Sequence, residues 1–416
     1  MEFIADFHIH SKYSRATSPQ MDLEYLDAVA RIKGIKVLGT GDFTHPAWLE
    51  NLKEKLEPAE PGLFKLKNSN SGTRFVLTAE ISCIYSKGGK VRKIHIIIFA
   101  PDFQAVEKIN TQLNWIGNLK SDGRPILGLD AKELAKIALS ASPDCLVVPA
   151  HIYTPWFSLF GSKSGFDSIE ECFEEYSKYI FAGETGLSSD PPMSWRNSNL
   201  DKIALISNSD AHSPAKLGRE ANVFDTELGY QSIVEAIKTK NSREFLYTIE
   251  FFPEEGKYHF DGHRNCGIRF SPQETKKHNG LCPVCGKPLT VGVLNRIEEL
   301  ADREEGFIPE KSLPFKSLVP LGEIIADVLN CSVGTKAVEK EYKDLIEKFG
   351  SEFKVLLNIS EKELAAATLV EISQAVIRVR EGKVIKEPGY DGVYGKIKIF
   401  GQPEDRKEVS GQKSLF

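Results

Sequence analysis

The sequence lacks the features that mark a membrane or secreted protein. It has no uninterrupted apolar run near the ~20 residues that a membrane span requires, and its start, with an acid at position 2, is not a basic leader. Neither sign of charge is in large excess, because the chain has 53 Lys and Arg residues and 58 Asp and Glu residues, for a net charge of −5. This balance argues against a uniformly basic surface but allows a local basic channel. We therefore expect a cytoplasmic protein with no membrane partner.

Cysteine is also scarce, with seven in 416 residues, and it is unevenly distributed. Four cysteines stand singly among apolar neighbours, as reduced core residues do: Cys83, Cys145, Cys172 and Cys331. The other three, Cys266, Cys282 and Cys285, lie close together in a polar stretch. In a chain expected inside the cell, such a cluster indicates a metal site rather than disulfides.

The length and composition predict two or three globular domains, since the chain is 41% hydrophobic and 27% charged. A basic, glycine-rich and cysteine-bearing stretch begins near residue 252. Beyond residue 293, apolar spacing predicts helices, followed by two β-rich runs around a Pro-Gly-Tyr-Asp-Gly turn. We expect a strand–helix domain (1–252), a metal module (253–293), a mainly helical domain with a terminal hairpin (294–400) and a flexible tail (401–416).

The first ten residues, M-E-F-I-A-D-F-H-I-H, alternate with the period of a β-strand. Asp6, His8 and His10 would share one face, so that two imidazoles could hold one metal ion. An isolated His-x-His fits equally well a strand that simply ends in polar residues.

The next 200 residues repeat one pattern, a helix followed by a short apolar strand that ends on a polar residue. Such strands pair in parallel, and their carboxyl ends meet at one face of a barrel. The polar residues at these ends are His8, His10, Asp42, Glu80, His95, His151, Asp210 and His212. Imidazoles with carboxylates suit zinc, manganese or iron better than magnesium or calcium. Any single member, such as His95 inside an apolar strand, could instead be a satisfied core histidine.

Eight candidate ligands imply two or three metal ions, because a catalytic zinc normally takes three protein ligands. Glu80 and Asp42 are suited to bridge such ions. Clustered metals lower the pKa of bound water and neutralise the charge of a phosphoester, so the pattern predicts phosphoester hydrolysis.

Six motifs in this region resemble, in order, those of the polymerase and histidinol phosphatase (PHP) superfamily. They are F-H-I-H-S (7–11), T-G-D (40–42), A-E-I-S (79–82), K-I-H-I (93–96), P-A-H (149–151) and S-D-A-H (209–212). The resemblance implies a distorted (β/α)7 barrel with up to three metals at its carboxyl face. The implied ligands are His8, His10, Glu80, His95, His151, Asp210 and His212. Members usually have a histidine after the T-D pair, where this chain has Phe43, so Asp42 or His45 could substitute.

Three carboxylates are candidates for the catalytic chemistry itself: Glu80, Asp210 and Asp190. Asp190 lies in a G-L-S-S-D-P-P loop (186–192), after the strand that ends near Glu184. It could complete a metal site or act as a general acid or base, and a turn-forming aspartate is an equal alternative.

The pairs H-x2-C at 263–266 and C-x2-C at 282–285 have the spacing of a zinc ribbon or knuckle. The predicted ligands are His263, Cys266, Cys282 and Cys285, with His259 and His278 as alternatives for one position. With all positions filled by protein, this site would be structural.

Two groups of side chains in the later domains could contact nucleic acid. The basic residues Arg264, Lys276 and Lys277 could bind phosphates or simply solubilise the surface. Tyr390 and Tyr394 could stack on bases, or they could be core-facing aromatics of a hairpin.

The last five residues, Q-K-S-L-F, resemble the peptide by which bacterial replication and repair proteins dock on the sliding clamp. Leu415 and Phe416 would fill an apolar pocket, and Gln412 would supply oriented hydrogen bonds.

A PHP-like region, then an H-x2-C and C-x2-C module, then a helical region with a Pro-Gly-Tyr-Asp-Gly turn follow one another along the chain. In this order, nearly the whole chain resembles the endonuclease Q family. This resemblance implies a DNA-repair endonuclease at the nucleoid that cuts 5′ to deaminated bases (uracil, hypoxanthine or xanthine) or abasic sites. It implies Zn²⁺ in the structural site, and Zn²⁺, Mn²⁺ or Mg²⁺ in the barrel cluster. Two other interpretations stay open: a small-molecule phosphatase of the histidinol-phosphatase kind, which leaves the zinc module idle, and a non-catalytic PHP scaffold, which so many ligands disfavour.

Overall fold

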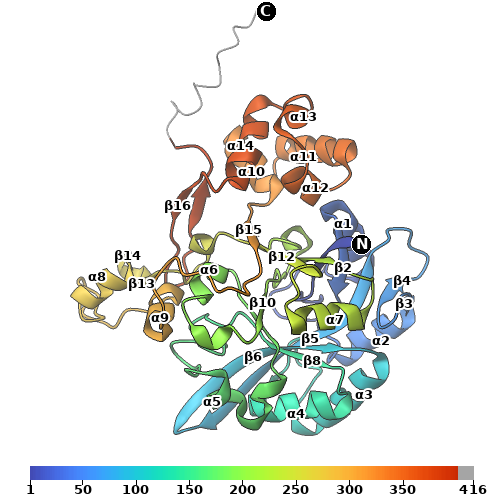
Figure 1. The fold of residues 1–416 in the computed structure, drawn as a ribbon, viewed down its shortest axis with the longest axis vertical. Coiled ribbons are helices and arrows are strands. Elements are labelled where there is room, and N and C mark those ends of the chain that lie inside the picture. Colours follow the sequence, from blue (N-terminus) through green and yellow to red (C-terminus); the bar gives the residue numbers. More distant parts are fainter. Residues whose placement is uncertain (402–416) are drawn as a thin grey trace, which may run out of the picture.

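A computed structural model describes residues 1–401, and it confirms the mixed α/β class (Figure 1). Its main sheet has eleven strands. They are β1 (Glu2–Asp6), β2 (Ile35–Gly39), β3 (Leu56–Pro58), β4 (Phe64–Leu66), β5 (Arg74–Lys87), β6 (Lys90–Ala100), β7 (Ile126–Leu127), β8 (Leu146–Pro149), β11 (Ala221–Asp225), β12 (Phe245–Glu250) and β15 (Phe315–Ser317). The order is β15-β12-β11-β1-β2-β5-β4-β3, with β6 paired to β5 and β8, and β7 paired to β5.

The strand pairing is parallel only in part. β1, β2 and β5 run parallel, as the alternation of strands and helices predicts. The prediction is wrong for six other pairs of this sheet, which are antiparallel: β1–β11, β11–β12, β3–β4, β4–β5, β5–β6 and β6–β8. The long strands β5 and β6 are joined at Gly88 and Gly89, whose φ angles are 60° and 73°. This tight turn leaves no room for a crossover helix, so the two strands form a hairpin.

Helices surround this sheet, and a short parallel pair, β9 (Ala182–Glu184) and β10 (Ala204–Ile206), lies beside β8. The helices of this part are α1 (Leu23–Lys33), α2 (Pro46–Lys55), α3 (Phe103–Ile116), α4 (Ala131–Ala141), α5 (Ile169–Phe173), α6 (Pro191–Ser194) and α7 (Tyr230–Thr239). The side chain of Asp130 caps α4, and that of Asp22 caps α1.

The first strand ends at Asp6, and His8 and His10 lie just beyond it. Asp6 is fully buried and accepts hydrogen bonds from the N–H groups of Ser209 (3.0 Å) and Gly218 (2.9 Å). Burial raises the pKa of Asp6 to about 6. Asp6 therefore ties the opening strand to the loop before β11, which carries two further candidate ligands.

The later part of the chain forms a small module and a helical region. The module contains β13 (Asp261–His263), β14 (Ile268–Phe270), α8 (Pro272–Lys277) and α9 (Val293–Leu300). The helical region contains α10 (Leu321–Leu329), α11 (Lys336–Phe349), α12 (Glu352–Leu357), α13 (Glu361–Ala365) and α14 (Val370–Arg380), and a hairpin of β16 (Ile385–Glu387) and β17 (Lys396–Lys398) follows. Figure 1 shows α10 to α14 at one end of the molecule, beside α1. Within residues 1–401, no helix is long and apolar enough to cross a membrane.

One buried ion pair joins the helical region to α1. Glu352 of α12 lies 2.7 Å from Lys33 Nζ, and the two side chains are 4% and 10% exposed. Glu352 also accepts hydrogen bonds from the N–H of Leu321 (3.1 Å) and the hydroxyl of Tyr342 (2.6 Å). A single carboxylate therefore holds α1, α10, α11 and α12 together.

We predict that Glu352→Ala lowers the free energy of unfolding by about 3 kcal/mol or more, because it leaves Lys33 buried without its partner. Urea unfolding followed by circular dichroism measures this change. Glu347→Ala, on the exposed face of α11, is the matched control and should leave the midpoint unchanged. Equal midpoints for the two variants would contradict the prediction.

Candidate functional site

Two groups of potential metal ligands meet at one end of the main sheet. Within each group, the ligand atoms lie within 4.8 Å of one another: His8, His10, Glu80 and Asp210 in one, and Glu80, His95 and His151 in the other. Glu80 belongs to both groups. Its Oε2 lies 3.2 Å from His10 Nε2, and its Oε1 lies 2.7 Å from His95 Nδ1 and 3.2 Å from His151 Nε2. A carboxylate whose two oxygens face separate groups has the geometry of a bridge between metal ions.

The electrostatics of these groups favour cations. Burial would lower the pKa of His8, but the carboxylates of Glu184, Glu80 and Asp210 outweigh it and hold that pKa well above its ordinary value. For His95, burial outweighs Glu80 and lowers the pKa to about 4, leaving the neutral imidazole that a metal requires. The Nε2 atom of His8 is buried and makes no hydrogen bond within the described residues. These donors therefore fit one or more divalent metal ions.

Two further carboxylates orient the histidines from behind. Asp42 accepts a hydrogen bond from His10 Nδ1 (3.1 Å), and its other oxygen accepts from the N–H and hydroxyl of Ser11 (2.7 and 2.6 Å). Glu184 accepts from His8 Nδ1 (3.0 Å) and from the N–H of His151 (2.8 Å). Because each carboxylate binds the Nδ1 atom of its histidine, the Nε2 atoms of His10 and His8 are left facing Glu80. This is the support that metal-binding histidines receive in proteins.

The backbone at this site is strained. His151, Asp42 and Asp210 have φ angles of 29°, 50° and 46°, in a region that residues other than glycine rarely adopt. Such strain persists where surrounding contacts hold the residue in place, and it concentrates at functional sites.

An open cleft of about 720 Å³ gives access to both groups. His95, His151 and Asp210 line it, and the side chain of Asp210 is 27% exposed. The basic side chains of Lys216 and Arg219 line the same cleft. Lys216 is paired with Glu323 at 2.7 Å, so Arg219 is the cation of this pair that could attract a polyanionic substrate.

Several predicted site residues lie outside the two groups. Asp42 stands behind His10, and the ring of His212 is tilted against that of His10, with centroids 4.4 Å apart. Phe43 is buried in the core, and the ring of His45 stacks on Tyr13 (4.5 Å).

Asp190 also stands apart from the two groups. It caps α6, where its Oδ1 accepts a hydrogen bond from the N–H of Met193 (3.0 Å). Burial raises the pKa of Asp190 to about 6. The structure therefore gives this carboxylate a capping role.

Two residues that contact the groups, Glu184 and Arg124, are not among the ligands predicted from the sequence. Glu184 ends β9, so the strand-end pattern that found the other residues could have included it. Arg124 donates to Glu80 Oε2 at 2.9 Å. Burial would raise the pKa of Glu80, but the guanidinium of Arg124 and the imidazoles beside it outweigh burial and hold that pKa well below its ordinary value. Arg124 comes from an irregular segment before β7, and nothing in its local sequence indicates this role.

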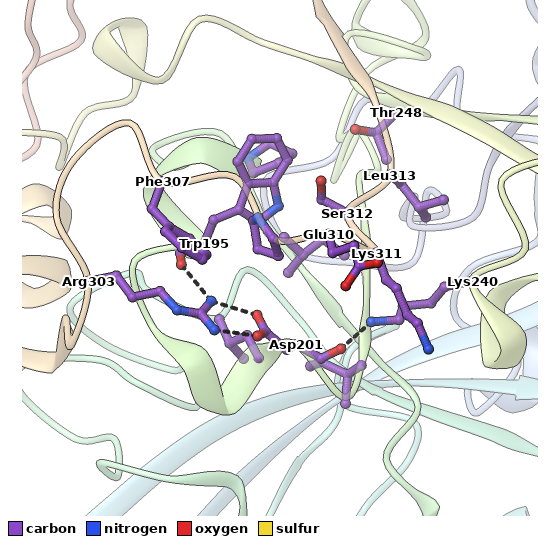
Figure 2. A pocket seen from close by; sticks show the side chains of 15 residues that line it. Trp195, Asp201, Lys240, Thr248, Arg303, Phe307, Glu310, Lys311, Ser312 and Leu313 are labelled. Carbon is purple, nitrogen blue, oxygen red and sulfur yellow. Dashed lines mark hydrogen bonds and ion pairs between the residues drawn. The ribbon is translucent and has the colours of Figure 1, made fainter.

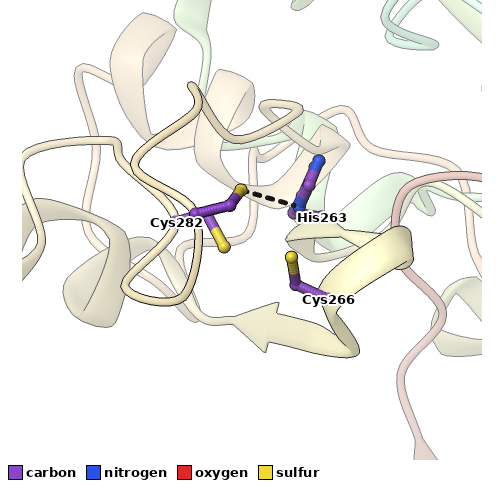
Figure 3. A group of neighbouring side chains, drawn as sticks. His263, Cys266 and Cys282 are labelled. Atoms are coloured by element: carbon purple, nitrogen blue, oxygen red, sulfur yellow. Dashed lines mark hydrogen bonds between the residues drawn. The ribbon is translucent and has the colours of Figure 1, made fainter.

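The predicted zinc ligands converge in the module (Figure 3). The ligand atoms of His263, Cys266, Cys282 and Cys285 lie within 4.8 Å of one another. Desolvation would raise the pKa of the Cys282 thiol, but backbone N–H groups at Cys285 and Val284 lower it to about 7, which favours the thiolate. The two alternative ligands are engaged elsewhere: His259 is buried against the carbonyl of Ser188 (3.2 Å), and His278 stacks on Phe270 (4.8 Å).

A second cavity, of about 280 Å³, lies between the segment around α6 and the loop 303–313. Figure 2 shows Arg303 reaching the carboxylate of Asp201 and the carbonyl of Trp195, and Lys240 donating to the carbonyl of Asp201. The polar groups at this cavity thus bind one another and anchor the loop.

The residues predicted to bind DNA lie on two surfaces. Arg264, Lys276 and Lys277 are on the module, where Lys276 lies 3.6 Å from Glu298. Tyr390 packs over Gly262, whereas Tyr394 is 62% exposed and lines the cleft. The predicted clamp-binding residues Gln412, Leu415 and Phe416 lie outside the described residues.

Buried histidines and carboxylates gathered in this way on an α/β fold define a metal-dependent hydrolase. The model of the MJ0043 C-terminal domain family matches residues 320–383. Protein MJ0043 of Methanocaldococcus jannaschii is 34% identical over 62% of this chain, which corresponds to only 33% of its own length. YqxK of Bacillus subtilis is 29% identical, covering 95% of this chain and 98% of its own.

Two solved structures match nearly the whole fold. The lesion-specific endonuclease PfuEndoQ of Pyrococcus furiosus has a TM-score of 0.85 and 32% identity, covering 99% of this chain and 100% of its own. Endonuclease Q in complex with a 27-mer duplex that has an abasic lesion at the active site has a TM-score of 0.86 and 32% identity, covering 99% of each chain. The chain belongs to the endonuclease Q family.

We predict that Cys282→Ser removes about one zinc ion per chain, because it breaks a four-ligand site whose binding energy helps the module fold. Zinc content by mass spectrometry of the purified protein measures the change, and limited proteolysis should cut the module faster. Cys331→Ser replaces an exposed cysteine remote in sequence from the module and should retain the metal. Unchanged zinc content in Cys282→Ser would refute the site.

Proposed function

We propose that the chain is a DNA-repair endonuclease that hydrolyses the phosphodiester 5′ to a deaminated base or an abasic site. The observation that carries this proposal is the buried Glu80, whose two oxygens face two ligand groups beside an open cleft. The crystallised relative with an abasic lesion at its active site supports DNA as the substrate.

The proposed architecture assigns one task to each part of the chain. Residues 1–252 form a distorted (β/α)7 barrel of the PHP kind, residues 253–293 form a zinc module, and residues 294–400 help to bind DNA. The order of strands and helices in 1–252 and the convergence of the four module ligands support this division.

We propose that the two ligand groups hold two or three divalent ions, which can be Zn²⁺, Mn²⁺ or Mg²⁺. Bound ions of this kind lower the pKa of water and neutralise the charge of a phosphodiester. The chain itself fixes the geometry, because Asp42 and Glu184 orient His10 and His8. Arg219 would bind a phosphate in the cleft.

We predict that the purified protein nicks duplex DNA containing a single deoxyuridine, deoxyinosine or abasic site, and that it does not hydrolyse histidinol phosphate. EDTA should abolish nicking and added Mn²⁺ should restore it. Gel electrophoresis of end-labelled duplexes measures the cut and its position. A metal-loaded protein that makes no lesion-dependent nick would overturn the proposed function.

In the same assay, His8→Ala and Asp210→Ala should each reduce nicking by about 100-fold or more, since each removes a donor from the shared metal site. His278→Ala is the matched control, because that ring stacks on Phe270 and touches neither ligand group. Wild-type rates in His8→Ala would refute the proposed site.

The sliding clamp is the second proposed partner, through Gln412, Leu415 and Phe416. Deleting residues 412–416 should leave nicking unchanged and weaken capture by immobilised clamp. Such docking would bring the nuclease to DNA at the nucleoid. Equal capture of the full chain and the shortened chain would contradict this proposal.

A further inference from the structure

Three aromatic side chains and a lysine line one wall of the cleft that leads to Glu80. They are Trp156, Lys257, Tyr258 and Tyr394, and we call them the aromatic wall. The wall draws on three distant parts of the sequence: the loop after β8, the segment before β13 and the turn between β16 and β17. The same cleft is lined by His95, His151 and Asp210 of the ligand groups.

The rings are arranged around the lysine. The Nζ atom of Lys257 lies 5.6 Å from the ring centroid of Tyr258 and 5.7 Å from that of Tyr394. The indole of Trp156 meets Tyr258 edge to face, with centroids 5.8 Å apart. Within residues 1–401, Lys257 makes no ion pair with a carboxylate, so its charge remains available to a ligand.

Packing within the fold does not explain why the side chains of Tyr394 and Trp156 are exposed. Tyr394 is 62% exposed and Trp156 is 37% exposed, whereas Tyr390, from the same turn, packs over Gly262. Tyr390 thus supplies the packing that a hairpin aromatic normally provides. An exposed aromatic group beside a functional cleft indicates a binding surface.

The wall is held in place before any ligand binds. The turn that carries Tyr394 is joined to the segment that carries Lys257 by backbone hydrogen bonds: Gly392 N–H donates to the Lys257 carbonyl (2.8 Å), and Gly395 N–H donates to the Glu255 carbonyl (2.9 Å). Asp391 accepts a bond from the N–H of Arg264 (2.7 Å) in the zinc module. A preformed surface loses little entropy when it binds.

Aromatic rings interleaved with cations are the surface that binds single-stranded nucleic acid, because rings stack on bases and cations attract phosphates. Arg219 adds positive charge to the same cleft, whereas Lys216 is paired with Glu323 at 2.7 Å. We infer that the aromatic wall stacks unpaired nucleobases of the strand that enters the cleft, beside the phosphate to be cut. This inference rests on the proposed function, and it names the side chains that hold the substrate.

The test separates base stacking from phosphate attraction. Fluorescence anisotropy of the full-length protein measures binding to labelled (dT)12 and to a twelve-unit strand of the same charge whose sugars all lack bases. We expect the wild type to bind (dT)12 more tightly. Tyr394→Ala and Trp156→Ala should each weaken (dT)12 binding by about fivefold to 100-fold, the range for losing one stacked base, and should leave the baseless strand unaffected.

Two control variants isolate the ring itself. Tyr394→Phe should bind like the wild type, because it keeps the aromatic face. Tyr179→Ala removes another exposed tyrosine that also lies beside a lysine, but away from the cleft, and should leave binding unchanged. Circular dichroism melting of each variant checks that it is folded.

Equal losses on the two strands would overturn the inference, because they would mean that the wall attracts phosphates only. Unchanged (dT)12 binding in Tyr394→Ala and Trp156→Ala would overturn it as well. Nicking of lesion duplexes by the wild type tests the proposed function separately. Ring-dependent binding without nicking would leave the stacking site standing and reject the endonuclease, and nicking without ring-dependent binding would reject only the stacking site.

Discussion

The candidate active site depends on the burial of one carboxylate. Glu80 has no exposed side-chain surface, and an isolated charge so placed would be expensive. Its cost is offset because His10 faces one oxygen, His95 and His151 face the other, and Arg124 donates to it as well. The rest of the site follows from this arrangement, since each partner must be brought to within about 3 Å of a single side chain.

The fold achieves this through the long β5–β6 hairpin. Glu80 and His95 face the same cluster because the two strands pair as neighbours, with Glu80 opposite Ile97 and Ser82 opposite His95. The parallel neighbours of β5 then bring the segments that follow β1 and β2 to the same edge. Asp6 fixes the loop that carries Asp210 to the end of β1. The site thus joins residues about 200 positions apart through a few buried hydrogen bonds.

The sequence predicted the parts of this arrangement that follow from local periodicity. The pattern of polar residues at the ends of apolar strands included His8, His10, Glu80 and Asp210, which the structure brings together. For Glu80 the expected position was wrong, because it lies inside β5 and antiparallel pairing with β6 places it beside His95. Spacing alone predicted that His263, Cys266, Cys282 and Cys285 converge, since H-x2-C and C-x2-C each impose a tight turn.

What the sequence could not predict depends on contacts made after folding. Asp42 and Glu184 are both strand-end carboxylates, and only their positions behind His10 and His8 distinguish an orienting residue from a ligand. Arg124 approaches from an irregular segment with no pattern of its own. Tyr390 and Tyr394 share one turn, yet one ring packs over Gly262 and the other lies exposed at the cleft. That last contrast bears on function, because hydrolysis of a small phosphate ester would require only the ligand groups. A cleft lined by exposed rings, next to the module of residues 253–293, suits a long strand with bases, so the second half of the chain is what favours DNA over a small ester.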